Sequence, residues 1–319
     1  MTEPVLQCPA CGGALASDAP VKCMRCGICN ASYPVINDVP ILICQEKSII
    51  DAAALVSQAA VLAPGTGYIP NRLKNALRKI LLPEIGMNWK SRSNYRRLQR
   101  ELLEQSSAPC VLVIGGGEMG DDLETFFPGK IISFVETDVY LGQRINYVCD
   151  AHDLPFTDAS FDGVIIQAVL EHVVDPARCV TEIHRVLKPR GIVYSATPFM
   201  QQVHMRAHDF TRFTDLGHRR LFRYFEEIDR GVCGGPGMAL AWSIRYFFSS
   251  FSNNSMVRAG LIVMSSWLTF WLKYLDYFIL ESPGGYDAAS GYYFIGRKQD
   301  TALSDQELVK QYRGFSKAY

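Results

Sequence analysis

Short runs of apolar residues, set off by glycine and proline, mark the expected strands of this chain. Residues 110–114, Cys-Val-Leu-Val-Ile, form a continuous apolar run that is typical of a strand buried in a parallel sheet. Similar runs occur at 131–135, 161–166 and 192–196, and a helix is predicted to begin at Pro176, between the last two. Strands that alternate with helices predict an α/β fold.

A glycine-rich segment directly follows the first run. Residues 115–120 read Gly-Gly-Gly-Glu-Met-Gly, and the first, third and sixth positions have the spacing of a dinucleotide-binding fingerprint. Glycine lets the backbone approach a ligand at the start of the next helix. Glu136 and Asp138 stand near the end of the next strand, where an acid can accept hydrogen bonds from ribose hydroxyls. This pattern fits a nicotinamide cofactor and other nucleoside cofactors equally well.

Four motifs further along separate these cofactor classes. In chain order they are Asp150-Ala-His-Asp-Leu-Pro-Phe, Ser160-Phe-Asp-Gly-Val-Ile-Ile, Leu170-Glu-His-Val and Glu182-Ile-His-Arg-Val-Leu-Lys-Pro-Arg-Gly. With the glycine-rich loop, they resemble class I S-adenosylmethionine-dependent methyltransferases in order and spacing. The resemblance implies a seven-stranded, Rossmann-like α/β sheet within a methyltransferase domain at 108–300.

The same resemblance assigns the cofactor site. The glycines would hold the methionine part of S-adenosylmethionine, an acid at the end of the strand 131–135 its ribose, and Asp150 and Ala151 its adenine. His172 is expected to pack at a helix start rather than to act in catalysis. The expected cofactor-binding residues are Gly115, Gly116, Gly117, Glu136, Asp138, Asp150, Ala151 and Gln167.

The acceptor is expected beside the loop 197–214, which follows the strand 192–196, because loops at the carboxyl edge of an open α/β sheet hold ligands. A hydroxyl acceptor needs a base to remove its proton, and His204, His208 and Asp209 are the predicted catalytic residues of this loop. Alternatively, Asp209 and Arg212 pair and only order the loop. The loop resembles that of a subgroup with small-molecule or glycan-type acceptors.

An apolar insertion interrupts the end of the expected sheet. Residues 226–230 and 291–297 resemble the sixth and seventh strands, which a short hairpin normally joins, whereas here 231–290 intervene. Within 241–280, the charge-free run 259–272 is too short for a membrane span. A helical stripe of Leu261, Met264, Leu268, Trp271, Leu275 and Phe278 predicts a helical hairpin that is buried or forms a homodimer. A membrane-surface patch, which would admit lipid-linked acceptors, is the alternative.

Cysteine spacing predicts a metal site near the N-terminus. Two Cys-x-x-Cys knuckles, one at 8–11 and one within 23–29, can form a closed tetrahedral site for structural zinc. The segment 8–43 also resembles zinc-ribbon-like modules that begin CPxCG and end in a YPVxxGIPxL-type strand. That resemblance places the second knuckle just before Tyr33-Pro34, which favours Cys26 and Cys29 over Cys23. The expected zinc ligands are Cys8, Cys11, Cys26 and Cys29.

A basic connector is expected between the zinc-ribbon-like module at 1–45 and the methyltransferase domain. Within this connector, 46–107, the stretch 70–100 holds nine basic residues and one acid. Leucine and isoleucine at positions 73, 77, 80 and 81 predict an amphipathic helix. We expect a solvated helix, with a phosphate-binding or membrane-surface role as the alternative. Residues 301–319 are expected to form a C-terminal tail.

Charge and composition limit the possible partners. The formal net charge is zero, so no global basic field favours nucleic acid, although the connector is basic. Residues 1–10 lack the basic start and apolar run of a signal peptide, so we expect a cytoplasmic protein, peripheral to the membrane if the insertion contacts lipid.

The sequence therefore predicts a methyltransferase that uses S-adenosylmethionine and carries structural zinc. Its expected reaction is O-methylation of a small-molecule, glycan or lipid-linked acceptor. An RNA methyltransferase acting on rRNA or tRNA is one alternative, because zinc-bearing rRNA guanine methyltransferases share this order of parts. A non-catalytic, cofactor-binding interaction module is the other.

Overall fold

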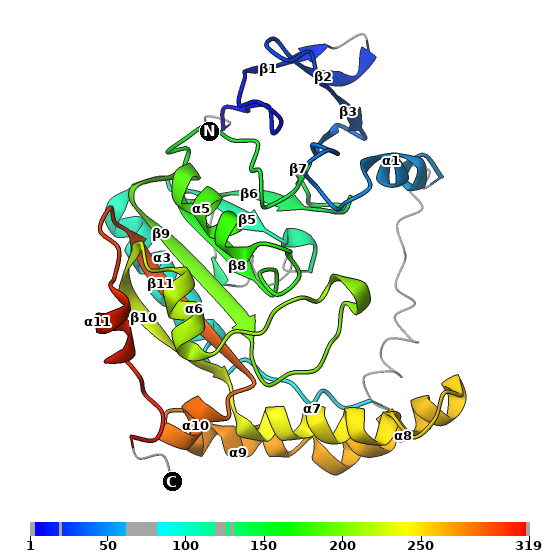
Figure 1. The fold of residues 1–319 in the computed structure, drawn as a ribbon, viewed down its shortest axis with the longest axis vertical. Coiled ribbons are helices and arrows are strands. Elements are labelled where there is room, and N and C mark those ends of the chain that lie inside the picture. The colour runs from blue at the N-terminus through cyan, green and yellow to red at the C-terminus, as the bar shows by residue number, and fades with distance from the viewer. Residues whose placement is uncertain (1–3, 19–20, 62–81, 119–125, 128–130, 317–319) are drawn as a thin grey trace.

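The computed structural model describes residues 4–18, 21–61, 82–118, 126–127 and 131–316, which form one long sheet with helices on both faces (Figure 1). The strand order is β1-β2-β3-β4-β7-β6-β5-β8-β9-β11-β10. The strands are β1 (Leu15–Asp18), β2 (Cys23–Cys26), β3 (Ser32–Ile36), β4 (Val39–Leu42), β5 (Cys110–Ile114), β6 (Ser133–Asp138), β7 (Tyr147–Cys149), β8 (Phe161–Gln167), β9 (Leu187–Pro198), β10 (Phe225–Gly234) and β11 (Gly291–Lys298).

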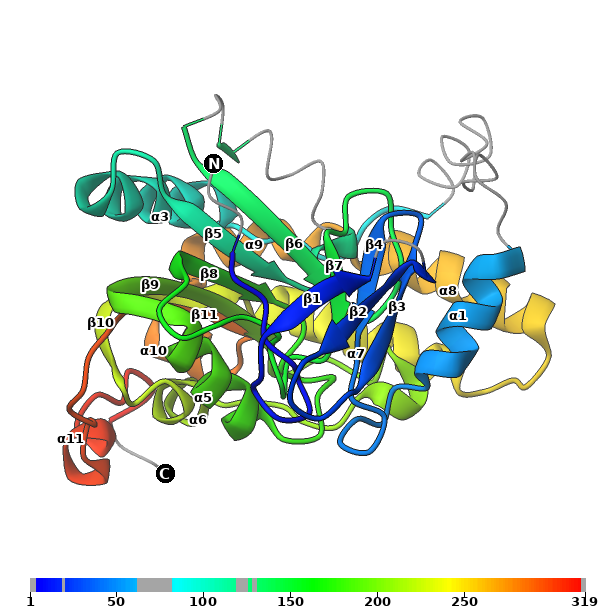
Figure 2. The ribbon, with the colours of Figure 1, turned by 90° about the horizontal axis from the view of Figure 1, so that it is seen from above.

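Helices cover both faces of the central strands. The described α-helices are α1 (Ala52–Val61), α3 (Ser91–Gln105), α5 (Pro176–Val186), α6 (Asp215–Leu221), α7 (Pro236–Ser249), α8 (Ser255–Thr269), α9 (Leu272–Ile279), α10 (Pro283–Asp287) and α11 (Asp305–Val309). Figure 2 shows α3 on one side of the sheet and α5 and α6 on the other. The parallel strands are therefore buried on both faces, as their continuous apolar runs predict.

The central strand β5 shows why such a run is needed. Successive side chains of a strand point to opposite faces. Leu112 and Ile114 accordingly join the core that includes Ile183 of α5, whereas Val111 and Val113 join the core under α3. Every position of the strand after Cys110 is thus in contact with a packed layer.

The prediction of a seven-stranded sheet was wrong, because the sheet has eleven strands. β7, β6, β5, β8 and β9 are parallel, and β11 and β10 follow as antiparallel strands, which accounts for the expected seven. The N-terminal module adds β1 to β4, since β4 pairs in parallel with β7 at Ile41↔Val148 and Leu42↔Cys149. An edge strand offers unpaired backbone groups, and here β4 occupies that edge.

The insertion forms a helical layer across one end of the sheet (Figure 1), where α7 packs beside α8 and α9. Of the two expected forms of this hairpin, the one with a buried apolar stripe is wrong, whereas the homodimer stays a prediction. Trp271 is 49% exposed and Phe278 79% exposed, while the buried side chains of α7 and α8 are small. Those buried small residues are Ala239, Ala241, Ser265, Ser266 and Thr269.

The rest of the connector contains α1, an irregular segment at 82–90 and α3. The amphipathic helix expected around positions 73–81 lies outside the described residues.

The helix predicted from Pro176 is α5. Its N-terminus is capped by Asp175, whose side chain accepts a hydrogen bond from Arg178 N. β9 begins at Leu187, earlier than the expected strand at 192–196.

Replacing Leu42 tests whether the N-terminal module shares the core of the sheet. Leu42 is fully buried in the core that includes Leu112, so Leu42→Ala is expected to lower the free energy of unfolding by about 2–5 kcal/mol. Urea unfolding followed by circular dichroism measures this. The control is Val21→Ala, at a side chain 64% exposed, and it should change stability by less than about 0.5 kcal/mol. Equal, small effects would contradict the shared core.

Candidate functional site

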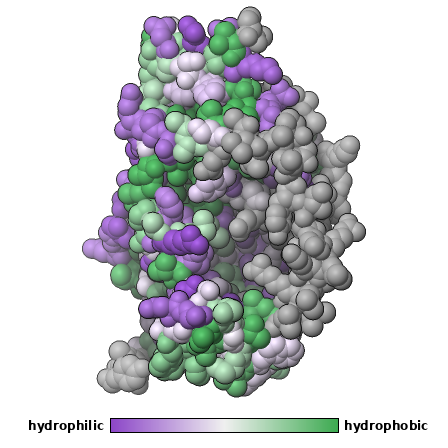
Figure 3. All heavy atoms as spheres, turned by 90° about the vertical axis from the view of Figure 1, so that its right-hand side faces the viewer, coloured by the Kyte–Doolittle hydropathy of each residue, from purple (hydrophilic) through white to green (hydrophobic). Residues whose placement is uncertain are grey.

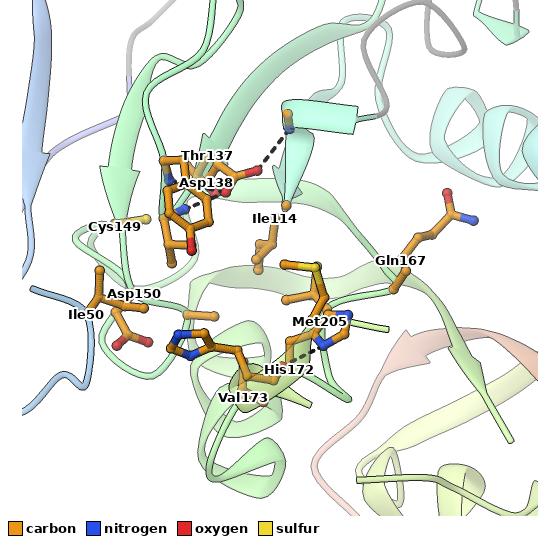
Figure 4. A pocket seen from close by; sticks show the side chains of 18 of the residues that line it. Ile50, Ile114, Thr137, Asp138, Cys149, Asp150, Gln167, His172, Val173 and Met205 are labelled. Carbon is orange, nitrogen blue, oxygen red and sulfur yellow. Dashed lines mark hydrogen bonds between the residues drawn. The ribbon is translucent and has the colours of Figure 1, made fainter. Parts of the chain in front are cut away.

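A cavity of about 680 Å³ lies at the carboxyl ends of the parallel strands. Figure 4 shows Asp138 at the end of β6, Asp150 after β7 and His172 after β8, all at this cavity. Of the expected cofactor-binding residues, the cavity wall includes Gly115, Gly117, Asp138, Asp150, Ala151 and Gln167.

The first turn after β5 requires glycine at two positions. Gly115 has φ +77°, and a Cβ there would lie 2.3 Å from Val169 Cγ2. Gly117 N–H donates a hydrogen bond of 3.0 Å to Asp138 Oδ2 (Figure 4), and a Cβ on Gly117 would lie 2.8 Å from that oxygen. The backbone therefore approaches the cavity without side chains, as a phosphate- or nucleoside-binding turn requires.

The two acids expected at the ribose lie in different places. Asp138 is in the cavity wall, and its Oδ1 also accepts the backbone N–H of Val139 at 2.7 Å. Glu136 is 5% exposed and is not among the described residues of the wall; it pairs with Arg144, whose Nε lies 3.1 Å from Oε1. Gly116 lies against Glu136, since a Cβ on Gly116 would lie 3.2 Å from Oε2 of that carboxylate. The geometry favours Asp138 as the ribose ligand.

Asp150 is held in place at the other end of the cavity. Its carboxylate accepts hydrogen bonds from Ser48 and, at 3.0 Å, from the backbone N–H of His152. Burial raises the pKa of Asp150, but the hydrogen bonds from His152 and Ser48 outweigh burial and hold the pKa below its ordinary value. Ile49 and Ile50, which follow Ser48, line the same end of the cavity. The N-terminal segment thus takes part in the cofactor site.

The connector also contributes residues that the sequence did not single out. Asn88, Ser91 and Tyr95 line the cavity. The Tyr95 hydroxyl donates to the side-chain oxygen of Gln167, and Gln167 Nε2 donates to the Tyr194 hydroxyl at 3.2 Å. These residues occur in no methyltransferase motif, and only the packing of α3 beside β8 and β9 brings them to the site.

A second cavity of about 590 Å³ adjoins the first. The two share Asn88, Gln167, Ala168 and His204 as wall residues. The second is bounded by the ends of β9 and β10, the start of β11, and by Met238 of α7 with Lys273 and Tyr274 of α9. The insertion therefore forms one wall of this cavity.

An acid and two histidines meet where the cavities join. Glu171 is fully buried, and its Oε1 lies 3.7 Å from His172 Nε2 and 4.0 Å from His204 Nε2. Neither Glu171 oxygen has a hydrogen-bond partner among the described residues. Burial raises the pKa of Glu171 to about 7. Sequence reasoning did not single out Glu171 as a site residue, although its position shortly after the end of β8, at the carboxyl edge of the sheet, could have indicated one.

Two of the three expected catalytic residues line a cavity, and the third does not. His204 and His208 line the first cavity, and His204 lines the second as well. Asp209 is not in the described wall of either. Its carboxylate accepts hydrogen bonds from Arg212 Nη2 and from the backbone N–H of His204, both at 2.8 Å. The Arg212 hydrogen bonds hold the pKa of Asp209 well below its usual range, so Asp209 orders the loop and its geometry does not suit a base.

The four expected zinc ligands come together at the N-terminal module. All four Sγ atoms lie within 4.8 Å of one another, with Cys8–Cys29 at 3.7 Å and Cys11–Cys26 at 3.5 Å. Tetrahedral sulfurs about 2.3 Å from one zinc ion stand about 3.8 Å apart, so the cluster fits this ion. Tyr33 OH lies 3.2 Å from Cys8 Sγ and can donate to a thiolate. Cys23 is outside the cluster, because residues three apart on β2 point to opposite faces.

Comparisons with known proteins agree with the central part of this site. Residues 134–195 match the family model described as a methyltransferase domain. The chain is 51% identical over 49 residues to a demethylmenaquinone methyltransferase of Clavibacter sepedonicus, covering 15% of this chain and 20% of that protein. It is 35% identical over 100 residues to the chloroplastic 2-phytyl-1,4-beta-naphthoquinone methyltransferase of Arabidopsis thaliana, covering 27% and 38%.

The chain thus spans less than half the length of these curated relatives. Among solved structures, it is similar to the 1,6-didemethyltoxoflavin-N1-methyltransferase of Burkholderia thailandensis, with a TM-score of 0.40 and 14% identity over 84% of this chain and 96% of that one. The family match supports an S-adenosylmethionine-dependent methyltransferase with an α/β fold.

Proposed function

We propose that this chain transfers a methyl group from S-adenosylmethionine to an oxygen of a small-molecule, glycan or lipid-linked acceptor. The observation that carries the proposal is the methyltransferase-domain match at 134–195, whose strands end at the larger cavity. S-adenosylmethionine supplies an electrophilic methyl group on a sulfonium. The chain must bind it, align the acceptor and remove the acceptor's proton.

The residues of the first cavity suit the three parts of this cofactor. The glycine turn at Gly115 and Gly117 would hold the amino-acid end, and Asp138 would accept hydrogen bonds from the ribose hydroxyls. Asp150 and Ala151 would frame the adenine, with Ile50 against the ring. The hydrogen bonds that already fix Asp138 and Asp150 preorganise both carboxylates for this task.

The second cavity is the proposed acceptor site. It meets the cofactor cavity at Gln167, Ala168 and His204, so an acceptor there would lie next to the methyl group. Its wall combines an apolar side chain of α7, Met238, with the polar Lys273 and Tyr274 of α9. Such a mixed wall supports an amphiphilic acceptor.

The exposed face of the insertion supports a lipid-linked acceptor and a protein that works at a membrane surface. Its large apolar side chains point outward, and Figure 3 shows such residues gathered at the end that α7 and α8 form. Small residues at the helix contact with large apolar ones outside are the arrangement of helices in lipid. Those exposed at 49–80% are Leu240, Phe247, Phe251, Met256, Val257, Trp267, Leu268, Trp271, Tyr274, Tyr277 and Phe278.

A membrane surface suits this face better than a second copy of the chain. Trp and Tyr are frequent at the lipid headgroup level, and the exposed Arg258 adds positive charge for anionic lipids. Among the described helices, none is long and apolar enough to cross a bilayer alone, whereas α8 and α9 pass on length and composition as a pair bent by 42°.

We also propose that Cys8, Cys11, Cys26 and Cys29 hold one structural zinc ion. The module is tied to the cofactor site by Lys47, whose Nζ donates to the carbonyls of Pro9 at 3.1 Å and Ala10 at 2.8 Å. The next residue is Ser48, the partner of Asp150. Zinc binding would therefore stabilise one end of the cofactor cavity.

Single cysteine replacements test the zinc site. Cys26→Ser and Cys29→Ser each remove one of four thiolates, so purified variants should lose most of the single zinc ion expected per chain in metal analysis. Cys23→Ser is the matched control and should keep it, because Cys23 lies outside the cluster. Zinc loss in Cys23→Ser with full retention in Cys29→Ser would contradict this ligand set.

Replacing the ribose acid tests the cofactor proposal. Asp138→Ala removes a charge-assisted hydrogen-bond acceptor, so the Kd for S-adenosylhomocysteine should rise about tenfold to a hundredfold, or 1.5–3 kcal/mol. Calorimetry measures this, with Glu136→Gln as the matched acid outside the wall, expected to bind within about threefold of the unmodified protein. Binding of NAD without S-adenosylhomocysteine, or a larger effect at Glu136, would oppose the assignment.

Vesicle flotation tests the membrane proposal. Phe247 and Val309 are both 62% exposed, but Val309 lies on α11, outside the insertion. Phe247→Glu should lower binding to phosphatidylglycerol vesicles about tenfold or more, because it loses an apolar side chain worth about 1.5–3 kcal/mol when buried. Val309→Glu should leave binding unchanged. No vesicle binding, together with a dimer that Phe247→Glu disrupts, would favour the homodimer instead.

A further inference from the structure

We propose that Glu171, His172 and His204 bind a divalent metal ion at the junction of the two cavities. The three residues come from two places, since Glu171 and His172 follow β8 and His204 lies in the loop after β9. Their ligand atoms lie within 4.8 Å of one another. Glu171 and His172 belong to the Leu170-Glu-His-Val motif, but His204 does not, and Glu171 has no hydrogen-bond partner among the described residues that would explain a buried carboxylate.

The hydrogen bonds around the two imidazoles decide which ring nitrogens are protonated. His172 Nδ1 lies 2.8 Å from the carbonyl oxygen of His208, which can only accept, so Nδ1 donates. His204 Nδ1 faces two acceptors at 3.4 Å, the Gln202 carbonyl and Asp209 Oδ2. In a neutral imidazole, a proton on Nδ1 leaves a lone pair on Nε2.

Both Nε2 lone pairs therefore point toward the carboxylate of Glu171. Three acceptor groups converge, and the described residues place no donor between them. Arg212 acts on Glu171 only through space, because its guanidinium is hydrogen-bonded to Asp209 and to the Gln202 carbonyl, so a cation between the three groups would supply the missing contact. The outer hydrogen bonds from Nδ1 to a carbonyl and a carboxylate are the ones that orient metal-binding histidines.

Distances and donor chemistry agree with one ion. Donors about 2.1 Å from a tetrahedrally coordinated ion stand about 3.4 Å apart, so the 3.7 Å and 4.0 Å separations need a contraction of about 0.3–0.6 Å. Two imidazole nitrogens and one carboxylate oxygen suit Zn²⁺, Mn²⁺ or Fe²⁺ and leave coordination positions open. This donor set differs from the four thiolates of the N-terminal module.

The position of the site gives the ion a role in the proposed function, on which this step rests. His172 lines the cofactor cavity, Glu171 lines the acceptor cavity, and His204 lines both. An acceptor hydroxyl that binds the ion would lose its proton to solvent more readily, because the ion stabilises the alkoxide. The acceptor oxygen then forms the new C–O bond as the S–CH₃ bond breaks and S-adenosylhomocysteine leaves.

Manganese binding to protein that holds one zinc ion per chain, enough for the cysteine cluster alone, tests the site separately from catalysis. Mn²⁺ prefers oxygen and nitrogen donors to thiolates, so it should leave the cysteine cluster filled with zinc. Titration followed by electron paramagnetic resonance should show one Mn²⁺ bound per chain. Glu171→Gln and His204→Gln should each raise its Kd at least tenfold, since each removes one of three protein ligands. His184→Gln replaces a histidine of α5 outside the cluster and should leave the Kd unchanged.

The outcomes separate this inference from the methyltransferase proposal. Thermal unfolding and S-adenosylhomocysteine binding of the same preparations show whether each variant is folded and competent for the cofactor. Cofactor binding with no bound Mn²⁺, or Mn²⁺ binding that Glu171→Gln leaves unchanged, would overturn the metal site while sparing the proposed function. The cluster would then hold a proton on Glu171 instead of an ion.

Discussion

Parallel strands must end at the same edge of a sheet, and the arrangement of this protein depends on that constraint. The last residues of four parallel strands lie at this edge, where the backbone is no longer paired and loops can meet. These strands are β6, β7, β8 and β9. Asp138, Asp150 and Glu171 follow three different strands yet border the same pair of adjoining cavities. The cores on both faces bury most positions of these strands, so the polar side chains at this edge can be held in fixed positions.

Two additions complete this edge, one from each end of the chain. At one side, β4 extends the sheet beside β7, and the segment after it brings Ser48 to Asp150 and two isoleucines to the cofactor cavity. At the other side, the insertion between β10 and β11 closes the second cavity. Asp276 anchors that layer, because its buried carboxylate accepts the backbone N–H groups of Gly237 at 2.6 Å and Met238 at 3.0 Å at the start of α7.

The insertion and the acid–histidine cluster show how an unusual burial pattern indicates function. A helical layer with serine and threonine inside and tryptophan and phenylalanine outside is reversed for a protein surrounded by water. The burial of Glu171 is also unusual, because buried carboxylate oxygens normally accept hydrogen bonds and those of Glu171 have no donor among the described residues. In each case the missing counterpart, an apolar phase or a cation, would supply the contact that the described part of the chain does not.

The sequence by itself determined the elements with strong local patterns. The apolar run at 110–114, the glycines at 115 and 117 and the cysteine knuckles depend on neighbours in the chain, so their spacing predicted β5, the cavity turn and a cysteine metal site, whereas the resemblance to zinc-ribbon-like modules selected Cys26 and Cys29. Tertiary structure alone decided which acid reaches the cavity. Both acids lie near the end of β6, but Glu136 pairs with Arg144 away from the described wall, whereas Asp138 lies in the wall. Tertiary structure also decided the eleven-stranded sheet and the position of Glu171 beside His204, since pairing and burial across long separations leave no local pattern.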